Sequence, residues 1–560
     1  MSLKKKQSLV TGAAILGAAA LIVKILGAIY RIPYQNITGD VGLAVYNKVY
    51  PIYSMLLILA TAGFPIAVSK IVSERLALGD TKGAKRVFII SQYVLIVTGL
   101  VFFAILFFGS GVIANLMGNP DLTIAIKGVS FALLIVPVMA GLRGYYQGHQ
   151  YMTPTAISQI IEQLVRVITI LVLSYWFINN GYSVYYAGAG AVFGATTGAI
   201  AALIVLIFFW NKIFSEKETD IINETFEQVK ENESLTDIIK VVLLYSIPIA
   251  VSALILPLLG VVDSFSVTNI LTDKITNSEY LFGFYIKGYN LVDFAEYWFG
   301  IFTRGQPLVQ FAAFFATALF LALVPSISEA HAKKNKGLII KRTELALRLT
   351  LLIGLPASIG LAVLAEPINI MLYKDSTGSL TMAILAFSTI FSTLFVTSSG
   401  VLQGIGKVIL PAKNLIIGII IKVILNIVLI YKFHINGAAM ATVLTFAFAT
   451  LLNIFDIYRL IKLRVNIISF IIKPVLAALM MGIIVYLTKS ILLYSIDTVF
   501  VSKRILMTVV TLSAVMVGVV TFGFSLFISG ALTKTDLEQI PKYGSKFAKI
   551  AGKLKILKEG

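Results

Sequence analysis

Four polar side chains occur at helical spacing inside an apolar stretch that follows Pro154. Gln159, Glu162, Gln163 and Arg166 share one face of a helix at about 100° per residue. Counted from Pro154, Glu162 and Arg166 would lie about 12–18 Å inside a bilayer. A bare charge there costs at least about 2.5–3.5 kcal/mol, so this face is expected to line a polar, water-filled cavity that binds a ligand. Alternatively, Glu162 and Arg166 neutralise each other as an i,i+4 pair and only tie helices together.

The same pattern occurs twice in the chain. Residues 147–173 are matched by residues 403–430, and both copies begin with Gln-Gly and continue through a proline into an apolar helix. Each copy has a cation 19 residues after its Gln, Arg166 in the first and Lys422 in the second, and Asn426 follows Lys422 by one turn. Two copies about 256 residues apart predict a duplicated half-protein, the usual organisation of secondary transporters.

The composition predicts the class of protein. Of 560 residues, 58% are hydrophobic and only 13% are charged, so the chain is expected to be an all-α, polytopic membrane protein. The absence of Cys excludes disulfides and thiolate metal sites, and no nucleotide-binding loop or catalytic motif is present. We therefore expect no enzyme activity and no cofactor. A coupling ion or the membrane potential remains open as the driving force.

About fourteen apolar spans can be placed along the sequence. Their predicted ranges are 8–30, 44–71, 87–109, 122–142, 154–178, 184–210, 239–262, 304–325, 343–364, 379–402, 411–431, 435–458, 470–489 and 505–529. The duplication groups them into two pseudo-symmetric six-helix lobes with two additional C-terminal helices. The predicted parts are an N-lobe (1–210), a cytoplasmic linker (211–238), a C-lobe (239–460), the last two spans (461–530) and a basic tail (531–560).

Charge predicts the orientation of the chain in the membrane. The net charge is +19, and most Lys and Arg lie on one side of the predicted spans. The positive-inside rule then places both termini in the cytoplasm. This excess faces anionic membrane lipid, on which the basic tail would lie, and a nucleic-acid partner is improbable.

Further cations occur in or beside the first eight spans, namely Lys24, Arg31, Lys48 and Arg304. Together with Arg166 they give this part of the chain a cationic excess. Cations that converge on a cavity suit an anionic substrate, and the planar fork of Arg suits phosphate in particular. For Lys24 and Lys48 the alternative is that the side chain extends to the membrane interface.

Four stretches carry a resemblance to a known family. They are YRIPYQNITGDVGLAVYNKVYPIY (30–53), LRGYYQGHQYMTPTAISQIIEQLVR (142–166), IPIAVSALILPLLGVVDSFSV (247–267) and RGQPLVQFAAFFATALFLALVPSISEA (304–330). The chain resembles the multidrug/oligosaccharidyl-lipid/polysaccharide exporter superfamily, within it the polysaccharide-biosynthesis branch of SpoVB and YtgP type, related to the MurJ lipid II flippases. The resemblance covers essentially the whole chain.

The resemblance implies a bacterial plasma-membrane protein that moves a lipid-linked cell-wall precursor, an undecaprenyl-pyrophosphate-linked sugar, to the outer leaflet. It implies a cavity lined by Arg from the first, second and eighth spans. Lys24 matches the first-span position and Arg304 falls near the eighth-span position. The second-span Arg has no counterpart, and Arg166 would supply part of that charge. The first eight spans would then hold the head group, and spans 9–14 would form an apolar groove for the prenyl tail.

Other functions remain open from the sequence. The chain could export another polysaccharide lipid intermediate, or it could be an ion-coupled drug exporter of the same superfamily. Drug exporters use cavity carboxylates, whereas the candidates here are mainly cationic. From a different class, the protein could be a non-transporting scaffold that binds cell-wall synthesis enzymes. A membrane glycosyltransferase is disfavoured because no catalytic carboxylate motif is found.

Overall fold

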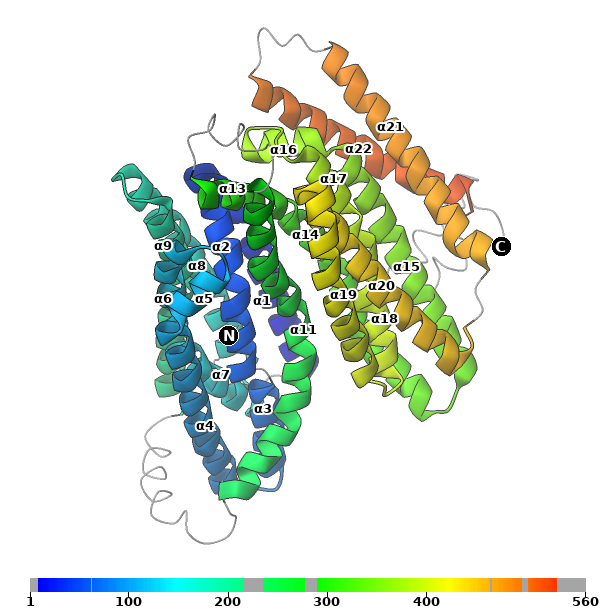
Figure 1. Cartoon of the computed structure of the whole chain (residues 1–560). Coiled ribbons are helices and arrows are strands. Elements are labelled where there is room, and N and C mark those ends of the chain that lie inside the picture. The colour runs from blue at the N-terminus through cyan, green and yellow to red at the C-terminus, as the bar shows by residue number, and fades with distance from the viewer. Residues whose placement is uncertain are drawn as a thin grey trace. The chain divides into compact units, whose positions relative to one another are not determined.

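The computed structural model describes residues 9–61, 63–214, 235–276, 290–463, 466–495 and 502–530. These residues form long helices, and no strand occurs among them (Figure 1). The predicted linker lies mostly, and the predicted basic tail entirely, outside the described residues.

The chain divides by packing into two compact units, residues 1–300 and 301–560. The helices of the first unit are α1 (Leu9–Ile29), α2 (Arg31–Thr61), α3 (Phe64–Ala77), α4 (Thr81–Phe108), α5 (Ser110–Leu116), η1 (Pro120–Leu122), α6 (Thr123–Ser130), α7 (Ala132–Gly148), α8 (Met152–Asn179), α9 (Val184–Ile213), α11 (Leu235–Thr276) and α13 (Leu291–Thr303, which ends just past the boundary). Those of the second are α14 (Gln306–Ala332), α15 (Lys336–Val363), α16 (Ala365–Tyr373), α17 (Ser379–Ala386), α18 (Ser388–Gly404), α19 (Ile409–Phe433), α20 (Ile435–Ile461), the π-helical turn η2 (Ile468–Ile472), α21 (Lys473–Ser495) and α22 (Lys503–Ile528).

The boundary between the units differs from the predicted one. The sequence assigned residues 239–262 to the second lobe, but α11 packs against α2, α3 and α4 of the first unit. The division therefore falls at residue 300, after α11 and nearly all of α13. Packing overrides chain order here because a long apolar helix is stabilised by whichever neighbours cover it.

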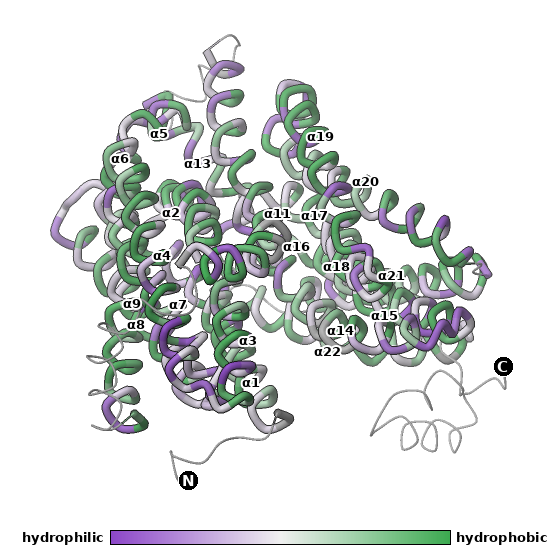
Figure 2. Tube along the Cα trace, turned by 90° about the horizontal axis from the view of Figure 1, so that it is seen from below, coloured by the Kyte–Doolittle hydropathy of each residue, from purple (hydrophilic) through white to green (hydrophobic). Residues whose placement is uncertain are grey.

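The number of long apolar helices agrees with a polytopic membrane protein. Among the described residues, eleven segments are long and apolar enough to cross a membrane. The first of these, Thr11–Ala77, contains two separate long helices, α1 and α2, and α11 and α14 also have spanning length. This arrangement accommodates the fourteen predicted spans. The hydropathy colouring of the trace shows hydrophobic residues along most of these helices (Figure 2).

The predicted end of the second span is wrong. The second span, predicted at 44–71, ends at Thr61, and α3 begins separately at Phe64 after Gly63, whose φ of 82° a helix cannot accommodate. The helix predicted from Pro154 begins at Met152. The short helix α13 is an addition to the predicted spans, because its 13 residues are too few to cross a membrane.

The duplication is visible in the helix lengths. The pair α6 and α7 has 8 and 17 residues, and the pair α17 and α18 has the same lengths. One turn residue separates the two helices of each pair, Phe131 in the first unit and Phe387 in the second. Helices α4 and α15 both have 28 residues and begin after a capping side chain, Asp80 or Asn335. The repeat is therefore structural as well as sequential.

Glycines on α9 allow it to lie close against α8. Gly190, Gly194 and Gly198 occur at intervals of four residues and face α8. A Cβ atom on Gly198 would lie 2.6 Å from the carbonyl oxygen of Glu162, and one on Gly194 would lie 2.9 Å from that of Arg166. Small residues at this spacing let two membrane helices approach closely. The stripe thus fixes the backbone that carries Glu162 and Arg166.

Replacing Gly198 with Val should displace α8 from α9, because the added side chain has no space against the Glu162 backbone. We expect a loss of about 1–3 kcal/mol in the free energy of unfolding, the usual cost of overpacking. The measurement is thermal unfolding in detergent, beside Gly111→Val as a control. No atom lies within 4 Å of the Cβ position of Gly111, so equal losses in both variants would contradict the packing argument.

Candidate functional site

A turn near the start of α2 brings a group of tyrosines together. Gly39 interrupts the helix with φ 69° and ψ −171°, a conformation open mainly to glycine. The chain folds back there, so that the hydroxyl of Tyr34 donates to the carbonyl of Gly42 at 2.7 Å. The hydroxyl of Tyr30 donates to that of Tyr46 at 2.6 Å. Residues on both sides of the turn therefore face one another.

Beyond the turn, Tyr46, Tyr50 and Tyr53 form a stripe on one face of α2. Their spacing of four and three residues places them on consecutive turns. The rings of Tyr46 and Tyr50 are stacked with centroids 5.4 Å apart, and those of Tyr50 and Tyr53 are 5.9 Å apart. Stacked rings hold one another in place, so this tyrosine stripe is a firm wall for the groups beside it.

Arg31 lies against the tyrosine stripe with donors that have no acceptor. Its guanidinium group interacts with Tyr30, Tyr46 and Tyr50. Within the part of the chain that the structure describes, its Nε and Nη1 atoms are buried without a hydrogen-bond partner. Unsatisfied buried donors are costly, more so on a charged group. Such donors call for a partner outside the protein, either ordered water, an ion or a ligand.

Glu162 holds two arginines from different helices. Arg166 of α8 donates from Nη2 to Oε1 of Glu162 at 2.7 Å, and Arg143 of α7 donates from Nη2 to Oε2 at 2.9 Å. Arg143 also donates from Nε to the hydroxyl of Ser158 at 3.0 Å. Arg166 interacts with Tyr46, Tyr50 and Tyr53, and among the described residues no acceptor reaches its buried Nε. The predicted pairing of Glu162 with Arg166 is thus present, and Arg143 joins it as a third member.

We use the term anion cluster for the group formed by Arg31, Arg143, Glu162 and Arg166. Arg31 and Arg166 are linked through Tyr46 and Tyr50, which both guanidinium groups approach. Three cations and one carboxylate give the cluster a net charge of about +2. A dianion with several oxygen acceptors would neutralise that charge and satisfy the orphaned donors. The charge and the free donors of the cluster would therefore suit a polyvalent oxyanion.

Three other predicted site residues, Gln159 and Gln163 of α8 and Lys24 of α1, differ in their burial and surroundings. Gln163 is buried and faces α1, where its Nε2 lies 3.5 Å from the Cβ position of Gly27. Gln159 is partly exposed on α8, and Lys24 is half-buried on α1. That this face lines a water-filled cavity stays a prediction.

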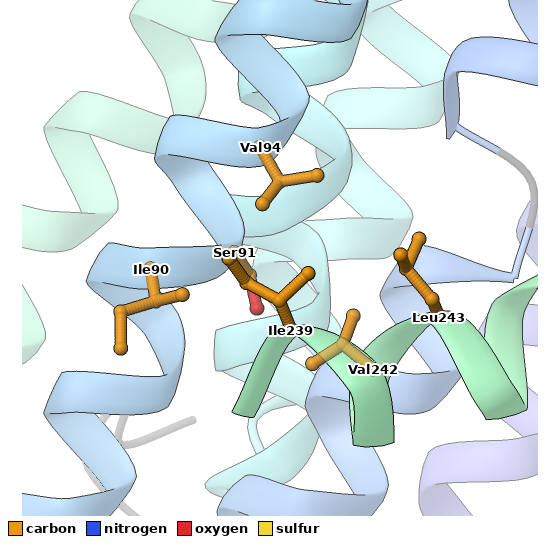
Figure 3. A pocket seen from close by; sticks show the side chains of 6 residues that line it. All are labelled: Ile90, Ser91, Val94, Ile239, Val242 and Leu243. Atoms are coloured by element: carbon orange, nitrogen blue, oxygen red, sulfur yellow. The ribbon is translucent and has the colours of Figure 1, made fainter. Parts of the chain in front are cut away.

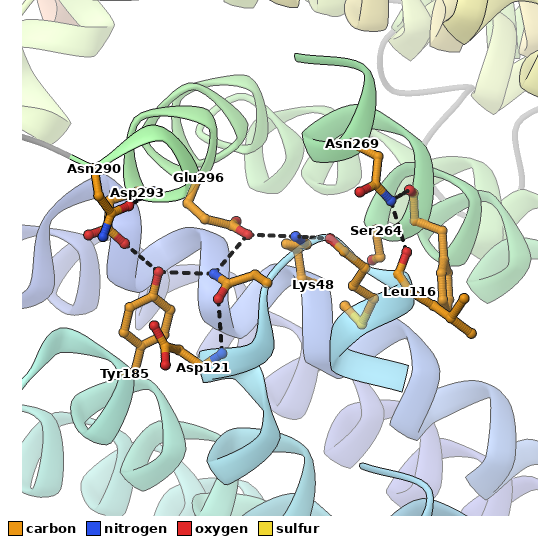
Figure 4. A network of polar contacts seen from close by, with 12 residues as sticks. Lys48, Leu116, Asp121, Tyr185, Ser264, Asn269, Asn290, Asp293 and Glu296 are labelled. Carbon is orange, nitrogen blue, oxygen red and sulfur yellow. Dashed lines mark hydrogen bonds and ion pairs between the residues drawn. The ribbon is translucent and has the colours of Figure 1, made fainter. Parts of the chain in front are cut away.

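Lys48 belongs to a different network of polar contacts, which is buried at Lys48, Asn119 and Glu296 (Figure 4). It donates to Glu296 of α13 at 2.6 Å and to the carbonyl of Met117 at 2.9 Å, and both charged side chains are 0% exposed. Asn119 donates to Glu296 at 3.1 Å and to the hydroxyl of Tyr185 at 2.9 Å. Lys48 is therefore held inside the fold rather than extended to an interface. Its predicted role in substrate binding stays a prediction.

Arg304 lies in the turn before α14, in the second unit, and is paired internally. Its two terminal nitrogens donate to both carboxylate oxygens of Asp375 at 2.9 and 3.0 Å, and its side chain is 1% exposed. Burial raises the pKa of Asp375, but the hydrogen bond and charge of Arg304 outweigh it and hold that pKa below its ordinary value. The lowered pKa means that the pair stabilises the fold above the unfolded pKa and is lost only as the pH falls through the folded one, in strong acid.

Arg304→Ala should therefore act on stability before it acts on ligand binding. We expect a loss of about 1–3 kcal/mol, because a charge-assisted bidentate bond disappears while the half-exposed Asp375 is rehydrated. The measurement is thermal unfolding in detergent, with Lys374→Gln as an exposed neighbouring control. A normal melting temperature combined with weakened ligand binding would return Arg304 to the binding site.

The second copy of the pattern carries different groups. Lys422 and Asn426 are both buried on α19. At a distance of about 256 residues, Ser399 occupies the place of Arg143 and Gly418 that of Glu162. A different network lies there, in which Asn414 donates to Asn453 at 3.0 Å and to the carboxylate of Asp456 at 2.7 Å. The position that matches Glu162 thus has no carboxylate in the second unit.

A narrow recess between α4 and α11 offers no alternative ligand site (Figure 3). It has no room for a water molecule and is lined by Ile90, Ser91, Val94, Ile239, Val242 and Leu243. Its one polar atom, the hydroxyl oxygen of Ser91, has no hydrogen-bond partner among the described residues. We interpret this recess as loose packing between two helices.

Sequence reasoning missed Arg143, the tyrosine stripe and Glu296. A signal existed for the tyrosines, since their i, i+4, i+7 spacing marks one helix face. Arg143 stands in the stretch 142–166 that carries the family resemblance, but nothing local shows that it reaches Glu162. Glu296 is 248 residues from Lys48, so only the fold reveals that pair.

The fold, with its many long apolar helices, is that of a multi-pass membrane protein. Two family models match the chain, "Polysaccharide biosynthesis protein" over residues 9–331 and "Lipid II flippase MurJ" over residues 305–507. The chain belongs to this polysaccharide biosynthesis family, within the multidrug/oligosaccharidyl-lipid/polysaccharide exporter superfamily. It is a membrane flippase or transporter rather than an enzyme.

Three relatives from Bacillus subtilis (strain 168) illustrate the family. The chain is 34% identical to the uncharacterized membrane protein YabM, over 96% of each chain. It is 30% identical to the lipid II flippase MurJ, over 80% of this chain and 82% of the relative. It is 28% identical to stage V sporulation protein B, over 82% and 86%.

Solved structures agree on the fold. A lipid II flippase MurJ in an inward closed conformation has a TM-score of 0.62 at 15% identity and covers 92% of this chain and 99% of that chain. An inward-facing multidrug resistance MATE family transporter has a TM-score of 0.59 at 15% identity, with 80% and 98% covered. At such identities the similarity shows the fold alone.

Proposed function

We propose that this protein moves a polyprenyl-pyrophosphate-linked cell-wall precursor, specifically lipid II, from the inner to the outer leaflet of the bacterial plasma membrane. The observation that supports this proposal is the anion cluster, in which three buried guanidinium nitrogens of Arg31 and Arg166 have no hydrogen-bond partner among the described residues. The name of the MurJ relative points to the same substrate.

The charge of the cluster matches that of the head group. A pyrophosphate esterified at both ends carries about two negative charges at neutral pH, and the cluster carries about +2. Such a group cannot enter hydrocarbon without losing its hydration, which costs several kcal/mol or more. Arginine donors replace that hydration with charge-assisted hydrogen bonds. The prenyl tail needs no such help, because it stays in lipid.

The membrane potential is a sufficient driving force under this proposal. The proposed movement carries a dianionic head group from the cytoplasmic side, which is negative, to the outer side. Each unit of charge gains about 2.3 kcal/mol per 100 mV. No coupling ion is then required, and the positive charge of the chain would face anionic lipid of the inner leaflet.

The test is a head-group accessibility assay in proteoliposomes that contain the purified protein and labelled lipid II. We expect labelled head groups to become accessible from the opposite side, faster when the potential is negative on the side from which they leave. A parallel assay uses a polyprenyl glycoside without pyrophosphate, which should not be moved. Transport of both lipids at equal rates would contradict a pyrophosphate site.

The same assay separates the competing functions. Transport of a different pyrophosphate-linked oligosaccharide in place of lipid II would indicate another polysaccharide pathway, as the family description allows. Export of a cationic drug without lipid transport would indicate a drug exporter. A protein that moves none of these, but copurifies with cell-wall synthesis enzymes, would be a scaffold.

A further inference from the structure

The carboxylate of Glu162 accepts hydrogen bonds from two arginines of the anion cluster. Each of its two oxygens accepts from a different arginine, at 2.7 Å from Arg166 and 2.9 Å from Arg143. These are the lengths of charge-assisted bonds between a guanidinium group and any oxyanion, a phosphate included. A phosphate that binds the same donors must displace the carboxylate.

The ion pairs of Glu162 are open to exchange. The side chains of Glu162, Arg143 and Arg166 are 15%, 13% and 12% exposed, whereas those of Lys48 and Glu296 are 0% exposed. Both networks lie in the first unit, but only the side chains of the Glu162 network are partly exposed. A sealed pair serves the fold, while an accessible pair can exchange one anion for another.

The net charge of the anion cluster determines how strongly it attracts a dianion with and without Glu162. With Glu162 ionised, the empty anion cluster has a charge of about +2, and a bound dianion brings it to about zero. Without Glu162 the cluster would have about +3 and would keep about +1 after binding. Three arginines alone would therefore hold a dianion more tightly than a transporter can use, because the head group must leave again.

We propose that Glu162 is an internal competitor for the phosphate-binding arginines, which weakens head-group binding so that the head group is released. When the head group binds, its phosphate replaces the Glu162 carboxylate on Arg143 and Arg166. The carboxylate competes for the same two arginines, so it favours release of the phosphate and pairs with them again afterwards. Glu162 is a positioning residue and remains ionised throughout. This inference rests on the proposed function, since it takes the anion to be a lipid-linked pyrophosphate.

The inference differs from the expectation that Glu162 merely ties helices together. A structural tie predicts that removing the carboxylate misplaces the arginines and weakens binding. A competitor predicts the opposite, because the arginines lose their resident anion and bind the ligand more strongly. The sign of the change in affinity therefore distinguishes the two roles.

The experiment compares Glu162→Gln with the unmodified protein in two measurements. The first is the Kd for a short-chain prenyl pyrophosphoryl-sugar diester, measured in detergent by calorimetry. The second is the flipping rate of lipid II in proteoliposomes. We expect the Kd of Glu162→Gln to fall by about tenfold or more, since repulsion between two charges a few Å apart is removed. We expect the maximal flipping rate to fall by a similar factor, because release becomes slow.

Two further variants complete the test. Glu162→Asp keeps a competing carboxylate and should recover much of the flipping rate. Glu74→Gln makes the same change in an exposed i,i+4 pair of the same unit and should change neither measurement. A weaker or unchanged affinity in Glu162→Gln, with an unchanged melting temperature, would overturn the proposal. If Glu162→Gln does not fold, Glu162→Asp decides, because a tie would show weaker binding and a competitor would not.

Failure of the inference can be told apart from failure of the proposed function. If the unmodified protein does not bind the diester, the proposed function is wrong. If it binds and flips the lipid, but Glu162→Gln binds no more tightly, only the role of Glu162 is wrong.

Discussion

Lys48→Ala should destabilise the protein by about 3–5 kcal/mol, the cost of leaving one member of a buried ion pair without its partner. Glu296 would then remain 0% exposed, with Asn119 as its main donor. Its second oxygen already has no hydrogen-bond partner among the described residues. The measurement is the free energy of unfolding in mixed micelles as the fraction of denaturing detergent rises.

A double variant provides the control for this prediction. In Lys48→Met with Glu296→Gln, both charges are removed and side chains of similar volume remain. Such replacements are often neutral within about 1–2 kcal/mol, so the double variant should be more stable than Lys48→Ala. If the double variant flips lipid at a normal rate, Lys48 takes no part in substrate binding. A stable Lys48→Ala variant that has lost ligand binding would reverse this assignment.

Arg31→Ala should abolish most lipid flipping while leaving the abundance of the protein nearly unchanged. The Nε and Nη1 atoms of Arg31 form no hydrogen bond within the described residues, so the fold loses little when they are removed. A ligand that meets both donors loses two charge-assisted bonds of about 1.5–3 kcal/mol each, which is a factor of about 100 or more in affinity. The measurement is the Kd for the pyrophosphate diester beside the flipping rate.

Arg31→Lys separates charge from geometry at the same position. A lysine keeps the positive charge but not the planar fork, so we expect an intermediate loss of about tenfold. Full flipping by Arg31→Ala at matched abundance would remove Arg31 from the site. A loss of the protein itself would instead show that Arg31 supports the fold through Tyr30 and Tyr46.

The sequence predicted the helices well, because long apolar runs between polar segments determine them. It also predicted that Glu162 and Arg166 can pair, since partners four residues apart meet on any helix. It did not predict that Arg143 joins them, because that contact depends on how α7 and α8 pack. Arg31 was chosen for its charge alone, and the unpartnered donors that single it out are visible only in three dimensions.

Lys48 and Arg304 show the limit of reasoning from charge and depth. Both were predicted substrate contacts because a cation in an apolar span needs an explanation. The explanation lies in partners far along the chain, Glu296 for Lys48 and Asp375 for Arg304. A single sequence does not reveal such partners, because sequence distance says nothing about which helices become neighbours.

The ion pair of Glu296 also lies close to the stretch of chain that joins the two units. Glu296 is anchored four residues before Gly300, where the first unit ends, and Arg304 is anchored four residues beyond it. The residues between these two ion pairs form the end of α13, and Phe299, Ile301 and Phe302 among them are buried. The connection is therefore a short, packed stretch of helix with a charged pair at each end, and breaking the Lys48–Glu296 pair would free one of those ends.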